Sequence, residues 1–300
     1  MKVSVIVPVY NSSAYLRDCL DSIASQTIGD IEVICVDDCS HDDSRVICQE
    51  YAQRDNRFRL FVLDQNSGAA AARNLGIAHA SGEYVAFMDA DDWYPAKDSL
   101  EVLYQAATEQ DADLCAGCID RFDEAQGEIV AVGPDEAHLA CFDFDHAGWI
   151  SYADWQYDYG FTRFLYRLAF LQKQGIEFPL LRRHEDPVFL VRCLVAAGSF
   201  YAVPHVVYRI RMGYKRMRFS EQQVDDALEG ISQVLAISYE RDLPQLRHWQ
   251  KVLMRQYVVQ TEGVLGDFFL KDLIAEITRR VPSKASSAVW KAVKRDGGKR

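Results

Sequence analysis

Short apolar runs alternate with segments of helical spacing along the first hundred residues. The runs are uninterrupted and rich in β-branched residues, as in strands buried on both faces of a parallel sheet; they cover residues 3–9, 31–36, 58–63 and 84–88. Between them, apolar residues recur every three or four positions and predict helices over about 15–27, 43–54 and 65–80. This order predicts an α/β fold with a mixed, mostly parallel sheet flanked by helices. Pro8 has no amide donor and should end the pairing of the first strand.

The pattern is less regular after residue 95. It predicts a helix that reaches about residue 110, strands over 114–119 and 203–208, and a helix over 188–197, while 120–150 resembles an acidic loop. The aromatic-rich stretch 151–170 fits either a core or the wall of a sugar pocket. A helical pattern runs from 221 to 278 and is interrupted at Pro244. We therefore expect a main domain over 1–218 and a helical C-terminal extension over 219–300.

Composition and charge narrow the class of protein. Hydrophobic residues make up 49% of the chain and charged residues 26%, which is typical of soluble globular proteins. The net charge of -11 argues against a general nucleic-acid binder. No apolar run approaches the roughly 20 residues that span a bilayer, and the chain starts directly with a strand pattern, so we expect a cytoplasmic protein without a signal peptide. Eight scattered cysteines, with Cys115 and Cys118 as a lone CxxC, indicate buried thiols rather than a zinc site.

The basic C-terminus departs from this acidic balance. Residues 279–300 hold eight Lys or Arg against one Asp, and a short helix is predicted over 283–295. A basic helix that carries Trp290 fits contact with an anionic membrane surface, which would place the protein peripherally at the inner face of the membrane. A solvated tail fits the same residues.

Three carboxylates follow the fourth apolar run, at Asp89, Asp91 and Asp92. The carboxyl ends of buried strands are where open α/β sheets bind ligands. Clustered carboxylates favour a cation between them, and oxygen ligands suit Mg²⁺ or Mn²⁺, which also take substrate phosphates. The same residues would fit a solvated acidic turn.

A second acidic pair, Glu185 and Asp186, precedes the helix predicted over 188–197. Its position has a structural explanation, because Asp186 would cap the helix and Pro187 suits its first position. Five basic residues follow within 209–218 and would either neutralise a diphosphate or form a solvated surface.

Five ordered motifs in the first 95 residues resemble those of family 2 glycosyltransferases, which have the GT-A fold. They are VSVIVPVYN (3–11), LxxCLDSIxxQT (16–27), EVICVDDCS (32–40), NSGAAAARNLG (66–76) and GEYVAFMDADDW (82–93). Glu185-Asp186-x-x-Phe189 and Tyr208-Arg209-x-Arg211 resemble later family features. The resemblance implies a nucleotide-sugar-binding half over 1–110, an acceptor half over 111–218, and inverting transfer of a sugar from a nucleotide-diphosphate donor.

The resemblance also implies a role for residues in the first half. Asp89-Ala90-Asp91 matches the D-x-D motif, with Asp91 as the direct contact of a Mn²⁺ or Mg²⁺ ion, beside Asp89 and Asp92. The family carboxylate that binds the base, usually uracil, matches Asp38. Further nucleotide contacts are expected from Pro8, Val9, Tyr10, Gly68 and Arg73.

Asp186 matches the catalytic base of the family, with Glu185 as its alternative, and Arg209 and Arg211 would help to hold the diphosphate. In many relatives the segment continues as Tyr-Arg-x-Arg-x-Gly-Ser, whereas here Tyr214 follows Gly213. The resemblance therefore does not extend to closure of this basic segment over the donor. The expected partners are a nucleotide-sugar, most simply a UDP-sugar, and a saccharide or lipid-linked saccharide acceptor of surface-polysaccharide or glycolipid synthesis.

Two other functions stay open. A non-catalytic nucleotide-sugar-binding or assembly protein would have the same fold, although the presence of all four family carboxylates argues against it. A nucleotidyltransferase would share the architecture, but the chain lacks a Gly-rich basic loop after the first strand.

Overall fold

The computed structural model describes residues 1–130, 143–213 and 220–254. These residues form one nine-stranded sheet in the order β3-β2-β1-β4-β8-β5-β9-β7, and β6 pairs with β5. The strands are β1 Val3–Val9, β2 Ile31–Asp37, β3 Phe58–Val62, β4 Tyr84–Phe87, β5 Leu114–Asp123, β6 Glu128–Val130, β7 Gly148–Ser151, β8 Phe164–Arg167 and β9 Ser199–Met212. Strands β3, β2, β1 and β4 are parallel, whereas the rest of the sheet is mixed.

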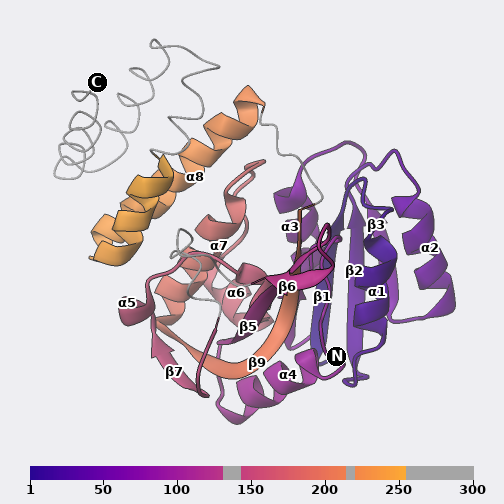
Figure 1. The fold of residues 1–300 in the computed structure, drawn as a ribbon, viewed down its shortest axis with the longest axis horizontal. Helices are drawn as coiled ribbons and strands as arrows, with labels where there is room; N and C mark the ends of the chain where they lie inside the picture. Colours follow the sequence, from indigo (N-terminus) through magenta and orange to yellow (C-terminus); the bar gives the residue numbers. More distant parts are fainter. Residues whose placement is uncertain (131–142, 214–219, 255–300) are drawn as a thin grey trace.

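Helices cover both faces of this sheet (Figure 1). They are α1 Leu16–Ala24, α2 Ser44–Arg54, α3 Ala69–His79, α4 Ser99–Glu109, α5 Tyr152–Trp155, α6 Leu168–Gln174 and α7 Glu185–Ala197, while α8 Glu221–Glu240 packs against α7. Successive side chains of a strand point to opposite faces, so Val5 and Val7 of β1 pack with α1, α2 and α4, while Ile6 packs with α3 and α7. The predicted α/β fold is confirmed. The main core consists of two apolar layers separated by the sheet, and residues of α8 form a third, smaller cluster with Met254.

The strand pairing at Pro8 differs from the expectation. Pairing of β1 with β4 ends at Ile6 opposite Phe87, but pairing with β2 continues through Pro8 to Val9 opposite Asp37. Although Pro8 has no amide donor, it does not end the pairing of β1 with β2, which keeps its register to Val9. Because β2, β1 and β4 are parallel neighbours, their carboxyl ends and the loops that follow them lie at the same edge of the sheet.

Residues 111–218 contain more strand than their sequence indicates. Strand β5 continues to Asp123, and β6 and β7 lie within the stretch expected to be a loop, of which residues 131–142 fall outside the described ranges. Strand β9 is 14 residues long and includes Arg209 and Arg211, which were expected in a basic loop. Long pairing between β5 and β9 explains both differences, because cross-strand partners stabilise polar residues that lack an apolar pattern.

Most of the aromatic residues in 151–170 belong to the core. Phe87 of β4 lies 5.1–5.9 Å, centroid to centroid, from four other rings, those of Phe161, Tyr166, Phe178 and Phe189. The rings of Phe178 and Phe189 are stacked 3.9 Å apart. Tyr159 differs from this group because 38% of it is exposed. The cluster fixes α7 against the centre of the sheet, so the first turn of α7 is held near the carboxyl end of β4.

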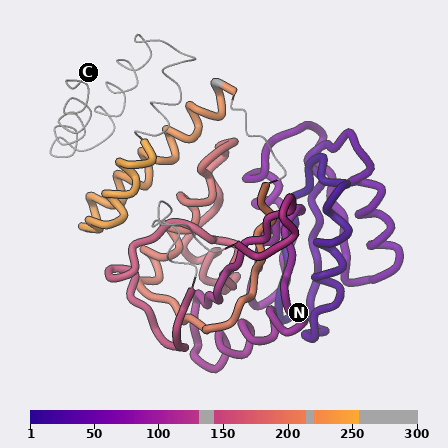
Figure 2. Tube along the Cα trace, in the orientation of Figure 1, coloured from indigo at the N-terminus to yellow at the C-terminus, as the bar shows by residue number. Residues whose placement is uncertain are grey.

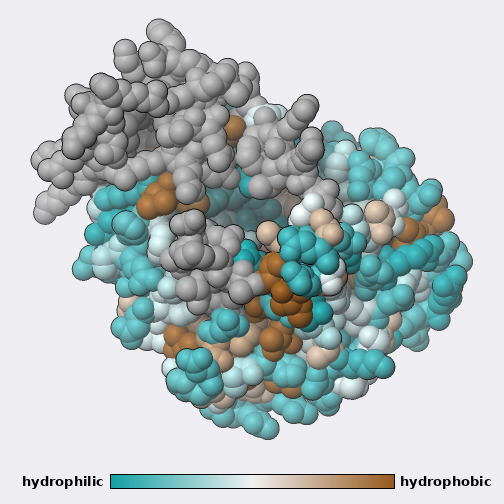
Figure 3. Space-filling view, in the orientation of Figure 1, coloured by the Kyte–Doolittle hydropathy of each residue, from teal (hydrophilic) through white to brown (hydrophobic). Residues whose placement is uncertain are grey.

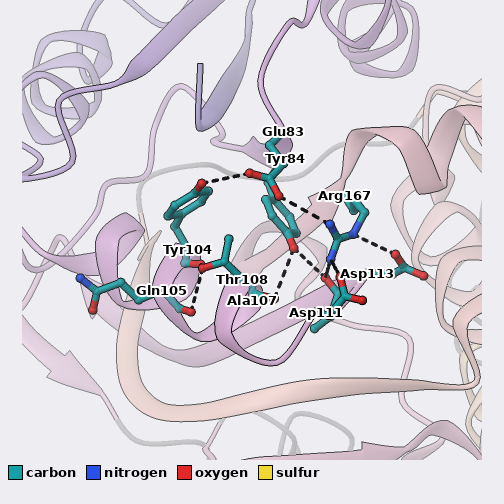
Figure 4. Close-up of polar contacts among 10 residues, drawn as sticks. Glu83, Tyr84, Tyr104, Gln105, Ala107, Thr108, Asp111, Asp113 and Arg167 are labelled. Carbon is teal, nitrogen blue, oxygen red and sulfur yellow. Dashed lines mark hydrogen bonds and ion pairs between the residues drawn. The ribbon is translucent and has the colours of Figure 1, made fainter.

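At the opposite end of β4, a polar cluster closes the sheet (Figure 4). Arg167 of β8 forms ion pairs with Asp111, Asp113 and Glu83 at 2.7, 3.0 and 3.5 Å. The Tyr84 hydroxyl donates to the carbonyls of Ala107 in α4 and of Ala112 shortly after it. These contacts join α4, β4, β5 and β8 far from the carboxylates that follow β4.

The C-terminal extension begins as expected with helix α8, and a second helical segment covers residues 244–254 (Figure 2). Pro244 is the first residue of that segment, a position where its missing amide costs nothing. The rest of the predicted helical region and the basic tail over 279–300 lie outside the described residues. Among the helices that the structure describes, none has the length and apolar character required to cross a bilayer.

The cysteines and the visible surface agree with a globular protein. Cys115 and Cys118 are buried free thiols, and Cys118 Sγ accepts a hydrogen bond from the amide of Phe144. The visible face of the described residues is mainly hydrophilic, with apolar residues in small separate groups (Figure 3).

Candidate active site

The three carboxylates after β4 differ in environment. Asp89 and Asp91 are partly exposed, whereas only 6% of Asp92 is exposed. Both carboxylate oxygens of Asp92 accept hydrogen bonds, Oδ2 from the hydroxyl of Tyr208 and Oδ1 from the amide of Arg211, each at 2.8 Å. The Tyr208 hydroxyl also accepts from the amide of Asp89 at 3.1 Å. Asp92 therefore anchors the acidic segment to β9, and this use of its oxygens argues against the metal-ligand role expected from the sequence.

Arg73 of α3 joins the two acidic regions. Its guanidinium contacts Asp89 Oδ1 at 2.8 Å and Glu185 Oε1 at 2.9 Å. It is almost completely buried and faces the ring of Phe161 at 4.7 Å. Burial disfavours a charge, but the two carboxylates more than offset this cost and raise the pKa of Arg73. The residue expected beside the nucleotide is thus the internal cation that holds the segment after β4 against the first turn of α7.

Asp186 lies in the first turn of α7, next to Glu185. The N-cap of this helix is His184, in the left-handed region at φ 65°, so the expectation that Asp186 caps the helix is wrong. Glu185 is buried against Arg73, while Asp186 is more accessible. Burial and the charge of Glu185 raise the pKa of Asp186 to about 7, and Arg73 only partly offsets them. A carboxylate with such a pKa is suited to accept a proton near neutral pH.

Asp38, after β2, organises the turn that precedes α3. Its Oδ1 accepts from the amide of Ser67 at 2.6 Å, and its Oδ2 accepts from the amide of Gly68 at 2.8 Å and from Asn66 Nδ2 at 3.0 Å. Gly68 has φ 90°, a conformation that L side chains rarely adopt, so a glycine is required there. The predicted base-binding residue therefore sits inside a defined turn at the N-terminus of a helix.

The residues at the end of β1 lie beside this turn. Val9 is fully buried in the core, and only its main chain reaches the site, where its carbonyl accepts from the amide of Asp38 at 2.8 Å. Tyr10 is 44% exposed, so its ring is available for stacking. Pro8 is partly exposed and Ala90 is buried.

The two arginines of β9 are already paired with carboxylates. Arg209 forms a two-pronged contact with Asp120 at 2.7 and 2.6 Å. Arg211 contacts Asp18 at 3.0 Å and Glu124 at 2.6 Å, and its guanidinium lies 4.5 Å from the ring of Trp93. Residues 214–219 of the expected basic loop lie outside the described residues. These pairs argue against direct binding of a diphosphate by Arg209 and Arg211, because the charge of each is locally neutralised.

Tyr208 and its partner Asp92 are the site residues whose roles the sequence did not reveal. Tyr208 belongs to an apolar strand pattern, and nothing in that pattern indicates a hydroxyl contact 116 residues away. Only the long strand β9, which runs past the segment after β4, brings the two together. An isolated bridge between Trp93 and Arg209 fixes the same alignment.

Asp89 and Asp91 would hold a divalent ion only if oxygen atoms of a bound substrate completed its coordination. The described residues contain no group of three or more His, Cys, Asp or Glu side chains able to hold a metal by themselves. Burial and the charges of Asp91 and Glu185 raise the pKa of Asp89 against the effect of Arg73, so a further cation would be favoured here. One or two carboxylates completed by phosphate oxygens are the usual Mg²⁺ arrangement.

Comparisons with known proteins show the family to which the chain belongs and its fold. Residues 4–171 match the model of the family described as glycosyl transferase family 2. The chain is 46% identical over 126 residues to glycosyltransferase GlyA of Streptococcus pneumoniae. The aligned stretch covers 42% of this chain and 18% of GlyA. The chain thus spans less than a fifth of GlyA.

Solved structures share the fold at low sequence identity. A crystal structure of Staphylococcus aureus TarS 1-349 in complex with UDP-GlcNAc has a TM-score of 0.70 and 19% identity, and covers 99% of this chain and 88% of TarS 1-349. The mannosyltransferase PcManGT from Pyrobaculum calidifontis, in complex with GDP-Man and Mn²⁺, has a TM-score of 0.58 and 17% identity, and covers 99% and 76% of the two chains.

Proposed function

This chain belongs to glycosyltransferase family 2 and has the GT-A fold, and from that premise we propose that it transfers a sugar from a nucleotide-diphosphate donor to an acceptor hydroxyl, with inversion. The observation that carries the proposal is the bridge from Asp89 through Arg73 to Glu185. This bridge holds the segment Asp89–Asp92, where the donor is proposed to bind, close to the first turn of α7. Donor and acceptor would meet there with a carboxylate on each side.

Asp186 is the proposed base. Its carboxylate would take the proton of the acceptor hydroxyl while that oxygen forms its bond to the anomeric carbon. The bond from the anomeric carbon to the diphosphate oxygen breaks in the same step, and the nucleoside diphosphate leaves with the electron pair. Glu185 is less suited to this role because Arg73 already holds its carboxylate.

Asp91, assisted by Asp89, is the proposed contact of a Mn²⁺ or Mg²⁺ ion whose coordination the donor diphosphate would complete. Such an ion would supply Lewis-acid stabilisation of the charge on the leaving group. The partly exposed position of both carboxylates supports this assignment, as does the Mn²⁺ in the PcManGT complex. Asp92 is left out of the proposed ligand set because Tyr208 and Arg211 occupy its oxygens.

A UDP-sugar is the proposed donor. The base is proposed to bind at the turn that the buried carboxylate of Asp38 organises, beside the exposed ring of Tyr10, and TarS was crystallised with UDP-GlcNAc. A saccharide or lipid-linked saccharide of a surface polymer is the proposed acceptor. Contact with the inner face of the membrane through 279–300 is a separate proposal, and unchanged flotation with anionic liposomes after removal of those residues would refute it.

Thermal unfolding in the presence of UDP tests the donor site. A ligand that binds only the folded state raises the unfolding temperature as its concentration exceeds its dissociation constant. We expect UDP to stabilise the protein in the presence of Mn²⁺ and to do so much less in its absence. A panel of UDP-sugars would then identify the sugar. If no nucleoside diphosphate shifts the transition, the donor site is not where we propose.

A further inference from the structure

Helix α8 holds the main chain of the segment that leads into α7. The carboxylate of Asp226 in α8 is almost completely buried, and its Oδ2 accepts a hydrogen bond from the amide of Arg182 at 2.8 Å. Its Oδ1 accepts from Gln222 Nε2 at 2.8 Å. A buried carboxylate that accepts two hydrogen bonds is a firm anchor, because its rupture would leave a desolvated charge without partners. Arg182 is therefore fixed at its main chain by the C-terminal extension.

The side chain of Arg182 reaches the turn before α3. Its Nη1 donates to Asn66 Oδ1 at 2.8 Å and its Nη2 donates to the Asn66 carbonyl at 3.1 Å. Asn66 Nδ2 in turn donates to Asp38 Oδ2 at 3.0 Å. A methyl group added at Gly68 would lie 3.8 Å from Arg182 Cγ, so the stem of the arginine covers the turn. Contacts thus run without a gap from α8 to the carboxylate proposed to bind the base.

Helix α8 also contacts the other end of the same segment. A Cβ at Gly230 would lie 2.8 Å from the carbonyl oxygen of His184, a distance that real Cβ atoms do not adopt. The absence of a side chain at Gly230 therefore allows α8 to pack directly on the residue before Glu185. The segment 182–184, which precedes α7, is thus held at both ends by α8, and α8 lies next to α7 (Figure 1).

We propose that α8 is a positioning element of the donor site, in which Asp226 and Arg182 hold Asn66, and through it Asp38, in the conformation that receives the nucleobase. This inference rests on the proposed function. Arg182 acts here as a positioning residue, because its two forked contacts are to Asn66. A turn held in advance binds a ligand more tightly because less ordering is lost on binding. Arg182 and Asp226 lie beyond residue 171, where the family match ends.

The affinities of UDP and uridine, measured side by side in the presence of Mn²⁺, test this role. We expect Arg182→Ala and Asp226→Ala each to weaken UDP about tenfold, the effect of one lost charge-assisted hydrogen bond. Uridine, measured by competition with UDP, should weaken by the same factor, because the defect lies at the base. The double variant should be no weaker than either single variant, since both residues act through one path.

Two further variants separate position from charge. Arg182→Lys keeps the positive charge but loses the planar fork, so it should weaken binding as Arg182→Ala does. Arg54→Ala removes an arginine that is exposed on α2, and it should leave both affinities unchanged. Thermal unfolding of each variant without ligand verifies that it is folded, and the exposed Arg182 side chain makes Arg182→Ala the safer of the two single changes.

Several results would overturn the inference. Loss of UDP affinity with normal uridine affinity, or rescue by Lys, would mean that Arg182 contacts the phosphates directly. Independent effects in the double variant, or no effect of either single change, would mean that α8 does not set the turn. Wild-type protein that binds no UDP would instead refute the proposed function, so the two failures are distinguishable.

Discussion

At the scale of single residues, the site depends on how one arginine distributes its charge. Arg73 contacts Asp89 and Glu185 and leaves Asp186 with a raised pKa. The pair of adjacent acidic residues is thereby divided into one that is held and one that can accept a proton. The resemblance to the family ranked Asp186 first and Glu185 as its alternative, but the sequence offered no physical reason for that ranking, because the partner of each carboxylate is set only in the folded chain.

The raised pKa of Asp186 predicts a pH-dependent stability in the absence of ligands. The folded pKa of about 7 exceeds the ordinary value of 3.8, so the folded state binds more protons between these values and stability falls as pH rises through that window. Asp186→Asn removes this effect. We expect the variant to match wild type near pH 4 and to be more stable by roughly 1–3 kcal/mol at pH 8, measured by urea unfolding without metal. A stability difference that does not change with pH would contradict this assignment.

At the scale of elements, strand β9 aligns the segment after β4. Tyr208 makes hydrogen bonds to the carboxylate of Asp92 and to the amide of Asp89. The strands and helices of residues 1–110 follow from local patterns in the sequence, since each buries an apolar face. The alignment by β9 does not, because it joins residues more than a hundred positions apart through polar contacts that leave no periodic signal.

Removal of the Tyr208 hydroxyl should therefore affect both stability and binding. Tyr208→Phe leaves Asp92 Oδ2 buried without its donor, which should cost about 1–3 kcal/mol in urea unfolding and weaken Mn²⁺-dependent UDP binding. Tyr94→Phe is the matched control: within the described part of the chain its buried hydroxyl has no hydrogen-bond partner. Equal effects of the two substitutions would show that the contact with Asp92 is unimportant.

At the scale of the whole molecule, β4 separates the ion-pair cluster around Arg167 from the carboxylates proposed to bind the donor. The cluster around Arg167 closes the end where β4 begins, and the carboxylates follow the end where it stops. The fold class was predictable from the apolar runs, whereas no order of the parallel strands in the sheet was predicted. The mixed strands β5 to β9 were predicted only in part, since their pairing depends on contacts between distant segments such as β5 and β9.

This separation predicts a variant that loses stability without losing donor binding. Arg167→Ala removes three ion pairs and a contact with the ring of Tyr84, and it should lower the free energy of unfolding by about 1–2 kcal/mol. The affinity for UDP, measured by titration calorimetry well below the unfolding temperature, should stay within about twofold of wild type. A large loss of affinity would mean that the two ends of β4 are coupled.

Parallel measurement of sugar transfer and UDP affinity in Asp186→Asn tests whether Asp186 is the base that takes the acceptor proton. The donor is the UDP-sugar that stabilises the wild-type protein most, and UDP release is followed with and without a saccharide acceptor. We expect acceptor-dependent release to fall by about 10²–10⁴-fold, because the base is lost, while UDP affinity stays near wild type. Glu185→Gln, measured beside it, separates the proton acceptor from the residue held by Arg73. Near-normal transfer by Asp186→Asn would contradict the proposed role of Asp186 as the base.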